Sequence, residues 1–386
     1  MFTGIEVTQY KRRLYVRCCG NNPFRQGYLA VVLVADQGRT KKRGVFHRLK
    51  RRFIMQKLMG ITVRSKWLIL AASTFLVLAV FGPAGAETAV EKIHFLIPGG
   101  AGGGWDGTAR GVGKALVDSG IIKQASFENM SGGGGGKALN HLISTAKRQQ
   151  GTLMVNSTPI IIRSLQGVFP QSFRDLTPIA AVIADYAAFV VPQNSKYQSW
   201  KEVIADFKKD PKSVKIAGGS VKGSMDHLVP AIAIEAAGGD PLKLVYIPYD
   251  AGGKAMAGLL SGDTQILSTG FSEAVGLAKQ GEVRILAVTS EERLPQTPEV
   301  PTLMELGYDV SFANWRGFFG APGLPDETAD AYRMVLKKMY TTSDWETIRT
   351  NRGWQNLFKP GREFYNFLED QEKSVGDIMR KLGFLK

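Results

Sequence analysis

The sequence predicts an α/β protein whose sheets are made of parallel strands and are covered by helices. From residue 90 onward, short runs of β-forming residues alternate with amphipathic helical patterns, which is typical of this class. The glycine-rich segments are short and stand where a predicted strand turns into a predicted helix, the place where α/β folds bind ligands. No internal repeat interrupts the alternation, and the roughly 300 residues after Ala86 suffice for two lobes with separate cores.

The predicted elements follow one another from Lys92. Ala109, Val112 and Leu116 lie near helical spacing and mark the buried side of the first predicted helix. The predicted strands are Lys92–Ile97, Ala125–Glu128, Thr152–Val155, Ile179–Ile183, Ala187–Val191, Val214–Ala217, Leu244–Ile247, Gln265–Ser268 and Arg284–Val288. Helices are predicted at Asp106–Val117, at Ala138–Ala146 and between most of the later strands.

The basic character of the chain is confined to its N-terminal segment. The whole chain has a formal net charge of +15, but residues 1–86 contain sixteen Lys and Arg against two Asp and Glu. The remaining residues are nearly neutral, with 33 basic and 32 acidic side chains. The high pI therefore does not indicate nucleic-acid binding, and we expect no nucleic-acid partner.

Residues 55–86 have the pattern of a secretory signal peptide. Lys57, Arg64 and Lys66 precede the uncharged apolar run Trp67–Phe81, and small residues at Ala84–Ala86 form a cleavage site. The apolar run is shorter than the roughly 20 residues that span a membrane, which disfavours the alternative of an anchor. We predict cleavage after Ala86 and a periplasmic mature protein.

Residues 1–54 show no pattern of a folded unit. Because a signal peptide works at an N-terminus, a true start at Met55 or Met59 explains them best, and a genuine basic extension is the alternative. Cys18 and Cys19 both fall in this leader, residues 1–86, so the mature chain can form neither disulfides nor a thiolate metal site.

Two glycine loops are the strongest functional signal. The first runs from Pro98 to Gly107 and the second from Ser131 to Gly136, and each opens a predicted helix. Glycines let the backbone approach a bound group, and a helix start offers free N–H groups and partial positive charge to an anion. We expect Asp106 to cap the first helix and both loops to meet at one anionic group. The alternative is that the glycines only shape turns.

The first glycine loop matches the spacing of one enzyme motif. Gly102, Gly104 and Gly107 match the spacing of a dinucleotide fingerprint, with Glu128 where its ribose-binding acid would fall. An exported dinucleotide-binding oxidoreductase-like protein is therefore the alternative function, although dinucleotides are cytoplasmic cofactors.

The other motifs fail, and no catalytic constellation is evident. Ser131 and Ala138 replace required residues of a P-loop, and Gly219–Gly223 has the wrong spacing for a serine-hydrolase elbow. The three histidines after residue 86 belong to no metal-ligand pattern. We expect no enzyme activity, no metal and no cofactor.

The order and spacing of several segments resemble the substrate-binding proteins of tripartite tricarboxylate transporters. No single motif is decisive, but together they extend over residues 90–386. The segments are Pro98–Asp106 (PGGAGGGWD), Glu128–Gly136 (ENMSGGGGG), Gly218–Leu228 (GGSVKGSMDHL), Ile247–Gly253 (IPYDAGG), Leu286–Gly307 and Trp315–Pro322. The sequence departs from the family at Gly270–Glu273, where members commonly have Phe-Asp-Asn, so a loop that touches ligand there would change the substrate.

The resemblance implies a type II periplasmic-binding-protein fold, in which two α/β lobes close over a cleft about a two-strand hinge. The first lobe would comprise residues 87–190 and 314–386, and the second residues 191–313, with crossings near Val190–Pro192 and Ala313–Gly317. A monomer of this kind would capture a small carboxylate, such as citrate or a dicarboxylate, and deliver it to membrane permease subunits.

The family binds its carboxylate through main-chain amides, hydroxyl groups and ordered water. Trp105 would be a lid over the ligand or core filling, and Ser224 a helix cap, a ligand contact or both. A carboxylate at Asp226 would repel the ligand, so we expect it to point away. The predicted ligand-binding residues are Gly102, Gly103, Gly104, Trp105, Asp106, Gly133, Gly134, Ser157, Thr158, Ser220, Ser224, His227, Tyr249, Gly252 and Gly253.

Overall fold

The computed structural model describes residues 5–10, 13–18 and 90–385 of the chain. The chain divides into two units, Met1–Phe81 and Gly82–Lys386. In the first unit, β1 (Ile5–Tyr10) and β2 (Arg13–Cys18) pair antiparallel, although the sequence predicts no folded unit there. The predicted cleavage point after Ala86 lies outside the described residues.

Within residues 90–385, ten strands form one continuous sheet. The strands are β3 (Lys92–Ile97), β4 (Gln124–Asn129), β5 (Thr152–Ser157), β6 (Thr177–Pro192), β7 (Lys215–Gly218), β8 (Val245–Pro248), β9 (Ile266–Gly270), β10 (Val283–Val288), β11 (Ala313–Gly320) and β12 (Gln355–Pro360). Their order is β4-β3-β5-β11-β6-β9-β7-β8, and β10 and β12 also pair with β6.

The sheet is mixed rather than parallel. β3 is parallel to β4 and β5, and β7 is parallel to β8 and β9, as the alternation of strands and helices predicts. All four partners of β6, however, run antiparallel to it. The prediction of parallel sheets is therefore right for the outer strands and wrong for the centre.

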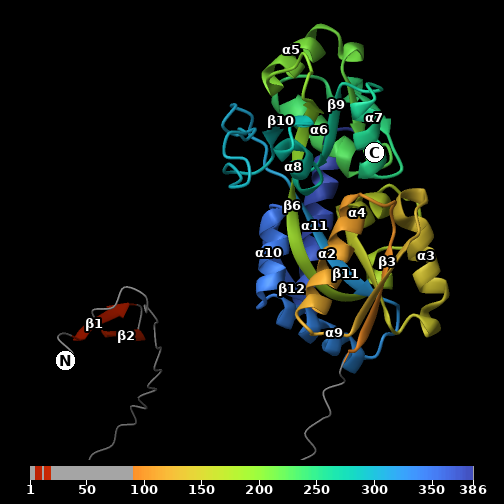
Figure 1. Cartoon of the computed structure of the whole chain (residues 1–386), viewed down its shortest axis with the longest axis vertical. Coiled ribbons are helices and arrows are strands. Elements are labelled where there is room, and N and C mark those ends of the chain that lie inside the picture. The colour runs from red at the N-terminus through yellow and green to blue at the C-terminus, as the bar shows by residue number, and fades with distance from the viewer. Residues whose placement is uncertain (1–4, 11–12, 19–89, 386) are drawn as a thin grey trace, which may run out of the picture. The chain divides into compact units, whose positions relative to one another are not determined.

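A single strand, β6, joins the two halves of this sheet. The sequence predicts two strands here, because Asp185 and Tyr186 interrupt the apolar run, but the backbone continues extended through both. Up to Tyr186 the strand pairs with β11 and β12, and from Ala187 it pairs with β9 and β10. Figure 1 shows β6 passing from one half of the unit into the other. This change of partners falls a few residues before the expected crossing at Val190–Pro192.

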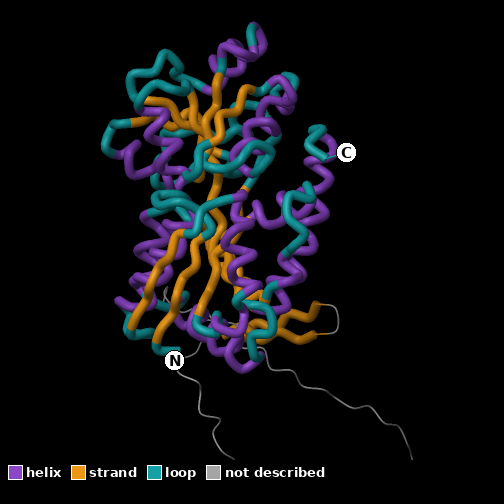
Figure 2. The backbone as a smooth tube through the Cα atoms, turned by 90° about the vertical axis from the view of Figure 1, so that its right-hand side faces the viewer, coloured by secondary structure: helices purple, strands orange, loops and turns teal. Residues whose placement is uncertain are grey.

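Helices cover both halves of the sheet, as Figure 2 shows in purple around the orange strands. They are α2 (Gly104–Asp118), α3 (Gly136–Ser144), α4 (Thr158–Leu165), α5 (Trp200–Lys209), α6 (Met225–Ala236), α7 (Gly252–Leu260), α8 (Phe271–Lys279), α9 (Asp326–Met339), α10 (Ser343–Asn351) and α11 (Gly361–Lys381). None of the described helices is long and apolar enough to cross a membrane.

Aromatic side chains stabilise each half. In the half that contains β3, Phe95 is fully buried with Phe127 and Phe318 each 5.4 Å away between ring centroids. In the other half, Phe189 stacks on Trp200 at 4.0 Å. Each buried ring contributes about 1.5–3 kcal/mol by leaving water. The largest buried cluster runs through both halves, from Leu96 and Phe173 to Phe189 and Trp200, so the halves are packed together around β6.

Candidate ligand-binding site

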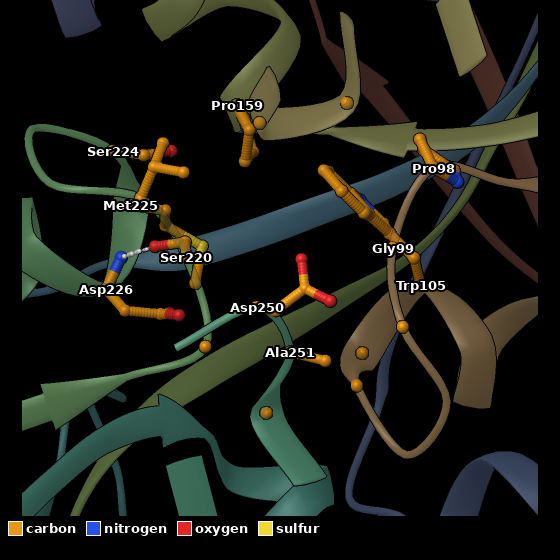
Figure 3. Close-up of a pocket in the computed structure, with 18 of the residues that line it drawn as sticks. Pro98, Gly99, Trp105, Pro159, Ser220, Ser224, Met225, Asp226, Asp250 and Ala251 are labelled. Atoms are coloured by element: carbon orange, nitrogen blue, oxygen red, sulfur yellow. Dashed lines mark hydrogen bonds between the residues drawn. The ribbon is translucent and has the colours of Figure 1, made fainter. Parts of the chain in front are cut away.

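A pocket of about 130 Å³ lies where loops of the two halves meet. Figure 3 shows residues from both halves around it. The lining residues are Pro98, Gly99, Gly100, Gly103, Gly104, Trp105, Ser131, Gly132, Gly133, Gly134, Gly135, Ser157, Pro159, Gly219, Ser220, Val221, Ser224, Met225, Asp226, Tyr249, Asp250, Ala251, Gly252, Glu273, Asn314 and Arg316.

Several helices begin at this pocket. The first residues of α2, α6 and α7 are in the lining, and so are the residues directly before α3 and α4. A helix start carries partial positive charge and unpaired N–H groups, so the pocket wall favours an anion.

The second glycine loop needs glycine for its backbone. Gly132, Gly133, Gly134 and Gly135 all have positive φ, at 139°, 60°, 65° and 99°. Other residues reach that region only with strain. A Cβ on Gly134 would also stand 3.2 Å from the Val221 side chain, so this loop contacts the opposite half of the molecule. In the first loop Gly102 has a positive φ of 77°, whereas Gly103 has an ordinary φ of −87°.

Trp105 lies between the core and the pocket. It packs against the core around β3, and it also lines the pocket. Its indole Nε1 donates a hydrogen bond of 2.8 Å to the Ser157 hydroxyl, which fixes the ring as a wall. The Ser157 oxygen accepts this bond, so the hydroxyl hydrogen can be donated to a ligand.

Two serines line the pocket from the other half. Ser224 is the N-cap residue of α6, but its hydroxyl makes no cap hydrogen bond and is therefore free for a ligand. The Ser220 hydroxyl accepts the backbone N–H of Asp226 at 3.0 Å, which is visible in Figure 3. Tyr249 and Gly252 complete this wall, as the sequence predicts for the loop before α7.

Five of the predicted ligand-binding residues lie outside the lining. Asp106 is not the helix cap, because α2 begins at Gly104; its carboxylate instead accepts from the Gly102 N–H at 3.1 Å and from Arg110 at 2.8 Å. Thr158 is buried behind the wall and Gly253 packs against the first loop.

Gly102 and His227 are the other predicted ligand-binding residues that lie outside the lining. The His227 Nδ1 accepts the Gly223 N–H at 3.0 Å, and the His227 ring stacks on Tyr246. Burial lowers the pKa of His227 to about 4, so the ring is neutral at pH 7. It supports the loop before α6 from behind.

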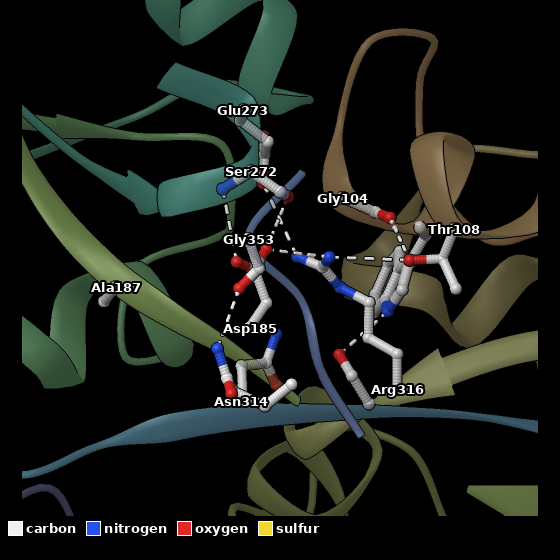
Figure 4. A network of polar contacts seen from close by, with 12 residues as sticks. Gly104, Thr108, Asp185, Ala187, Ser272, Glu273, Asn314, Arg316 and Gly353 are labelled. Carbon is white, nitrogen blue, oxygen red and sulfur yellow. Dashed lines mark hydrogen bonds and ion pairs between the residues drawn. The ribbon is translucent and has the colours of Figure 1, made fainter. Parts of the chain in front are cut away.

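A buried charge network forms one wall of the pocket and was not predicted. Figure 4 shows the Arg316 guanidinium beside Asp185 and Glu273. Arg316 lies 2.9 Å from Asp185 and 3.6 Å from Glu273, and the Arg316 side chain is 2% exposed. Asp185 also accepts from the N–H and hydroxyl of Ser272. Glu273 lies where the sequence departs from the family pattern, at Gly270–Glu273, and Arg316 lies in the matching segment Trp315–Pro322, but neither was predicted as a site residue.

Two carboxyl groups in the lining have raised pKa values. Burial, with the charges of Asp226 and Asp185, raises the pKa of Glu273 to about 8, although Arg316 opposes the shift. Burial raises the pKa of Asp226 to about 6. The expectation that Asp226 points away is wrong, because its carboxyl group points into the pocket in Figure 3. The Ser220 hydroxyl and the Gly219 backbone N–H make this position tolerable.

The loops of the two halves touch across the pocket. The Ser131 hydroxyl donates to the Asp250 carboxylate at 2.6 Å. A Cβ on Gly103 would lie 3.4 Å from the Gly252 nitrogen, which shows how closely the two glycine-rich turns approach. Ordinary side chains at these positions would hold the two halves apart.

The dinucleotide alternative finds no support in this geometry. Glu128 lies in β4 beside His94, 3.3 Å away, and is absent from the pocket lining. The described residues also contain no group of three His, Cys, Asp or Glu side chains placed to hold a metal.

Two α/β halves on a shared strand, with a loop-built pocket between them, define a ligand-binding protein of the periplasmic-binding-protein class. The solved structure of the periplasmic binding protein BugD matches with a TM-score of 0.70 at 21% identity, covering 76% of this chain and 98% of that one. MatC (Rpa3494) from Rhodopseudomonas palustris, solved with bound malate, matches with a TM-score of 0.66 at 19% identity, covering 74% and 98%. At these identities the likeness establishes the fold.

The family follows from the sequence comparison. The model of the TctC family, described as tripartite tricarboxylate transporter family receptor, matches residues 109–384. A "UPF0065 protein in tcbD-tcbE intergenic region" of Pseudomonas sp. strain P51 is 28% identical over 262 residues, 66% of this chain and 75% of that protein. The chain belongs to the TctC family of solute-binding receptors, which confirms the resemblance and the predicted fold.

Proposed function

We propose that this receptor works in the periplasm, captures a small carboxylate between its two halves, and delivers it to the permease of a tripartite tricarboxylate transporter. The observation that carries the proposal is the convergence of helix starts and hydroxyl groups on one pocket. Hydrogen bonds from amides or hydroxyl groups to a charged acceptor contribute about 1.5–3 kcal/mol each, so a few of them hold a carboxylate without a free cation.

Two further observations support a carboxylate. Ser157 and Ser224 present hydroxyl groups without cap bonds from opposite halves, so one anion could bridge the halves and favour closure. The MatC structure carries malate, a dicarboxylate, in the same fold. Export rests on the signal-peptide pattern of residues 55–86.

A thermal-shift screen tests the proposal directly. Purified residues 87–386 are heated with a panel of mono-, di- and tricarboxylates, and with NAD and ATP as controls. A carboxylate at 100 times its dissociation constant should stabilise the protein by about 2.7 kcal/mol. Stabilisation by a nucleotide and by no carboxylate would refute the proposal.

Delivery is tested in cells that express the matching permease. Uptake of the radiolabelled carboxylate should require the receptor and should fall at least tenfold with Gly134→Val, at equal receptor abundance. Unchanged uptake without the receptor would contradict the role in transport.

A further inference from the structure

The pocket has two chemically different sides. The donor side consists of Gly133–Gly135, Ser157 and Ser224. It offers the N–H groups of Gly133 and Gly134 and the two serine hydroxyl groups, whereas the Gly135 N–H donates to the Gly132 carbonyl. The acidic side consists of Asp226 and Glu273, which offer carboxyl groups. A ligand made only of carboxylates would suit the first side and not the second.

The one cation in the lining does not neutralise the acidic side. Arg316 makes its shorter ion pair with Asp185, at 2.9 Å, and its pair with Glu273 is 3.6 Å long. Asp185 is completely buried behind the wall, and its negative charge balances much of the positive charge of Arg316. Asp226 is 7% exposed and makes no ion pair within the described residues; Arg316 acts on its charge only from a distance.

The surroundings of Glu273 disfavour another negative charge. Four charged groups interact with it: Arg316 from β11, Asp185 from β6, Asp226 from α6, and Arg352 after α10. Burial and the two aspartates together raise the pKa of Glu273 to about 8 despite Arg316. A ligand carboxylate beside it would add to this repulsion, whereas a ligand cation would relieve it.

We propose that the ligand carries a protonated amine as well as a carboxylate, with the amine held by Glu273 and Asp226 and the carboxylate by the donor side. This inference rests on the proposed capture of a small carboxylate and narrows its substrate class. Glu273 lies in the loop where this chain departs from its family. In this inference, Glu273 makes the protein bind an amino acid in preference to a simple dicarboxylate.

The first test compares acids that differ only in an amine. Isothermal titration calorimetry is run with the pairs aspartate and succinate, and glutamate and glutarate. In at least one pair the amine-bearing acid should bind the wild type at least tenfold more tightly. Tighter binding of the amine-free acid in both pairs, or equal binding, would overturn the inference and leave the proposed function intact. Binding of no carboxylate at all would refute both.

The second test reads the proton on Glu273 and needs no variant. At pH 7 this carboxyl group is mostly protonated, and an ammonium group beside it lowers its pKa, so binding releases a proton. Titrations in two buffers of different ionisation enthalpy should show release of up to one proton per ligand. Proton uptake would contradict the inference, since it indicates an anion beside Glu273.

Variants then locate the effect. Glu273→Gln keeps the shape of the side chain and should lose the preference for the amine at least tenfold, together with the proton release, while the amine-free acid binds no more weakly than to the wild type. Asp226→Asn should lose part of the preference. The control Glu128→Gln, remote from the pocket, should change neither quantity. Circular dichroism confirms that each variant is folded, and an unchanged preference in folded Glu273→Gln would sink the assignment.

Discussion

The donor side and the acidic side of the pocket face the same ligand but are built on opposite principles. The donor side uses neutral groups held by glycine backbone, so removing them from water costs less free energy than removing charged groups. The acidic side uses ionisable groups whose burial raises their pKa values, and Arg316, which is also paired with Asp185, offsets that cost only in part. The contrast teaches that the first side determines that an anion binds, whereas the second determines which anion.

Breaking the pair behind the acidic side should have the largest effect on the protein. Arg316→Met removes the cation and leaves Asp185 buried and uncompensated, which typically costs 3–5 kcal/mol. Chemical denaturation should report a loss of this size. The matched control is Lys114→Met, which removes an exposed partner of Asp118 and should cost less than about 1 kcal/mol. Equal small losses would show that the buried pair does not support this wall.

The second prediction concerns pH and separates the two sides by titration. Glu273 and Asp226 have raised pKa values of about 8 and about 6, so the folded state holds protons that the unfolded state has already released. The stability they contribute is complete below their unfolded pKa values and is lost as pH rises through their folded values. His227, whose pKa is lowered from 6.5 to about 4, opposes this trend below pH 6.5. The free energy of unfolding should therefore fall most clearly between pH 6.5 and pH 8, by at most about 1.4 kcal/mol per pH unit for each proton.

Urea titrations at several pH values measure this slope. Glu273→Gln should flatten it between pH 6 and pH 8, whereas Ser224→Ala on the donor side should leave the slope as it is. A wild-type stability that rises with pH over this range would contradict the assignment of raised pKa values.

Substitution in the glycine loops should weaken ligand binding more than it weakens the fold. Gly134→Val combines a strained positive φ with contacts 3.2 Å from Val221 and Arg163, so it should reduce carboxylate affinity at least tenfold, about 1.4 kcal/mol. Gly167→Val is the matched control, since Gly167 has the same φ of 65° as Gly134, has open space around its Cβ and lies outside the pocket lining. Calorimetry and melting temperature are measured on both. A lower melting temperature with unchanged affinity in folded Gly134→Val would mean that the loop is only a turn.

The smallest effect is expected where the loops meet across the pocket. Ser131→Ala removes the 2.6 Å hydrogen bond to the exposed Asp250 and should weaken ligand binding by about 0.5–1.5 kcal/mol. Ser213→Ala, which removes an exposed bond to a local carbonyl, is the control. Calorimetry should resolve the difference, and equal affinities would show that this contact does not stabilise the closed form.

The two sides also differ in how far the sequence could predict them. The donor side follows from local rules, because a glycine loop between a strand and a helix carries its function in adjacent residues. The acidic side depends on Asp185 and Arg316, which are far apart in the sequence and meet only because β11 pairs with β6. Arg316 lies in the matching segment Trp315–Pro322, but that segment does not show what Arg316 pairs with. Asp185 stands in no motif, and a charged residue inside an apolar strand indicates a break, which is why β6 was predicted as two strands. Strands β3, β5 and β10 were predicted closely because their apolar runs are continuous.

The split first half of the sheet sets the order in which the chain can fold. Strands β3, β4 and β5 come early, but β11, which lies between β5 and β6, is made more than a hundred residues later. The other half needs only β6 to β10, a continuous stretch, so its contacts close shorter loops and can form first. Until β11 arrives, β5 has an open edge and the early strands cannot complete their core. The first half of the sheet therefore stays incomplete until β11, in about the last fifth of the chain, is present.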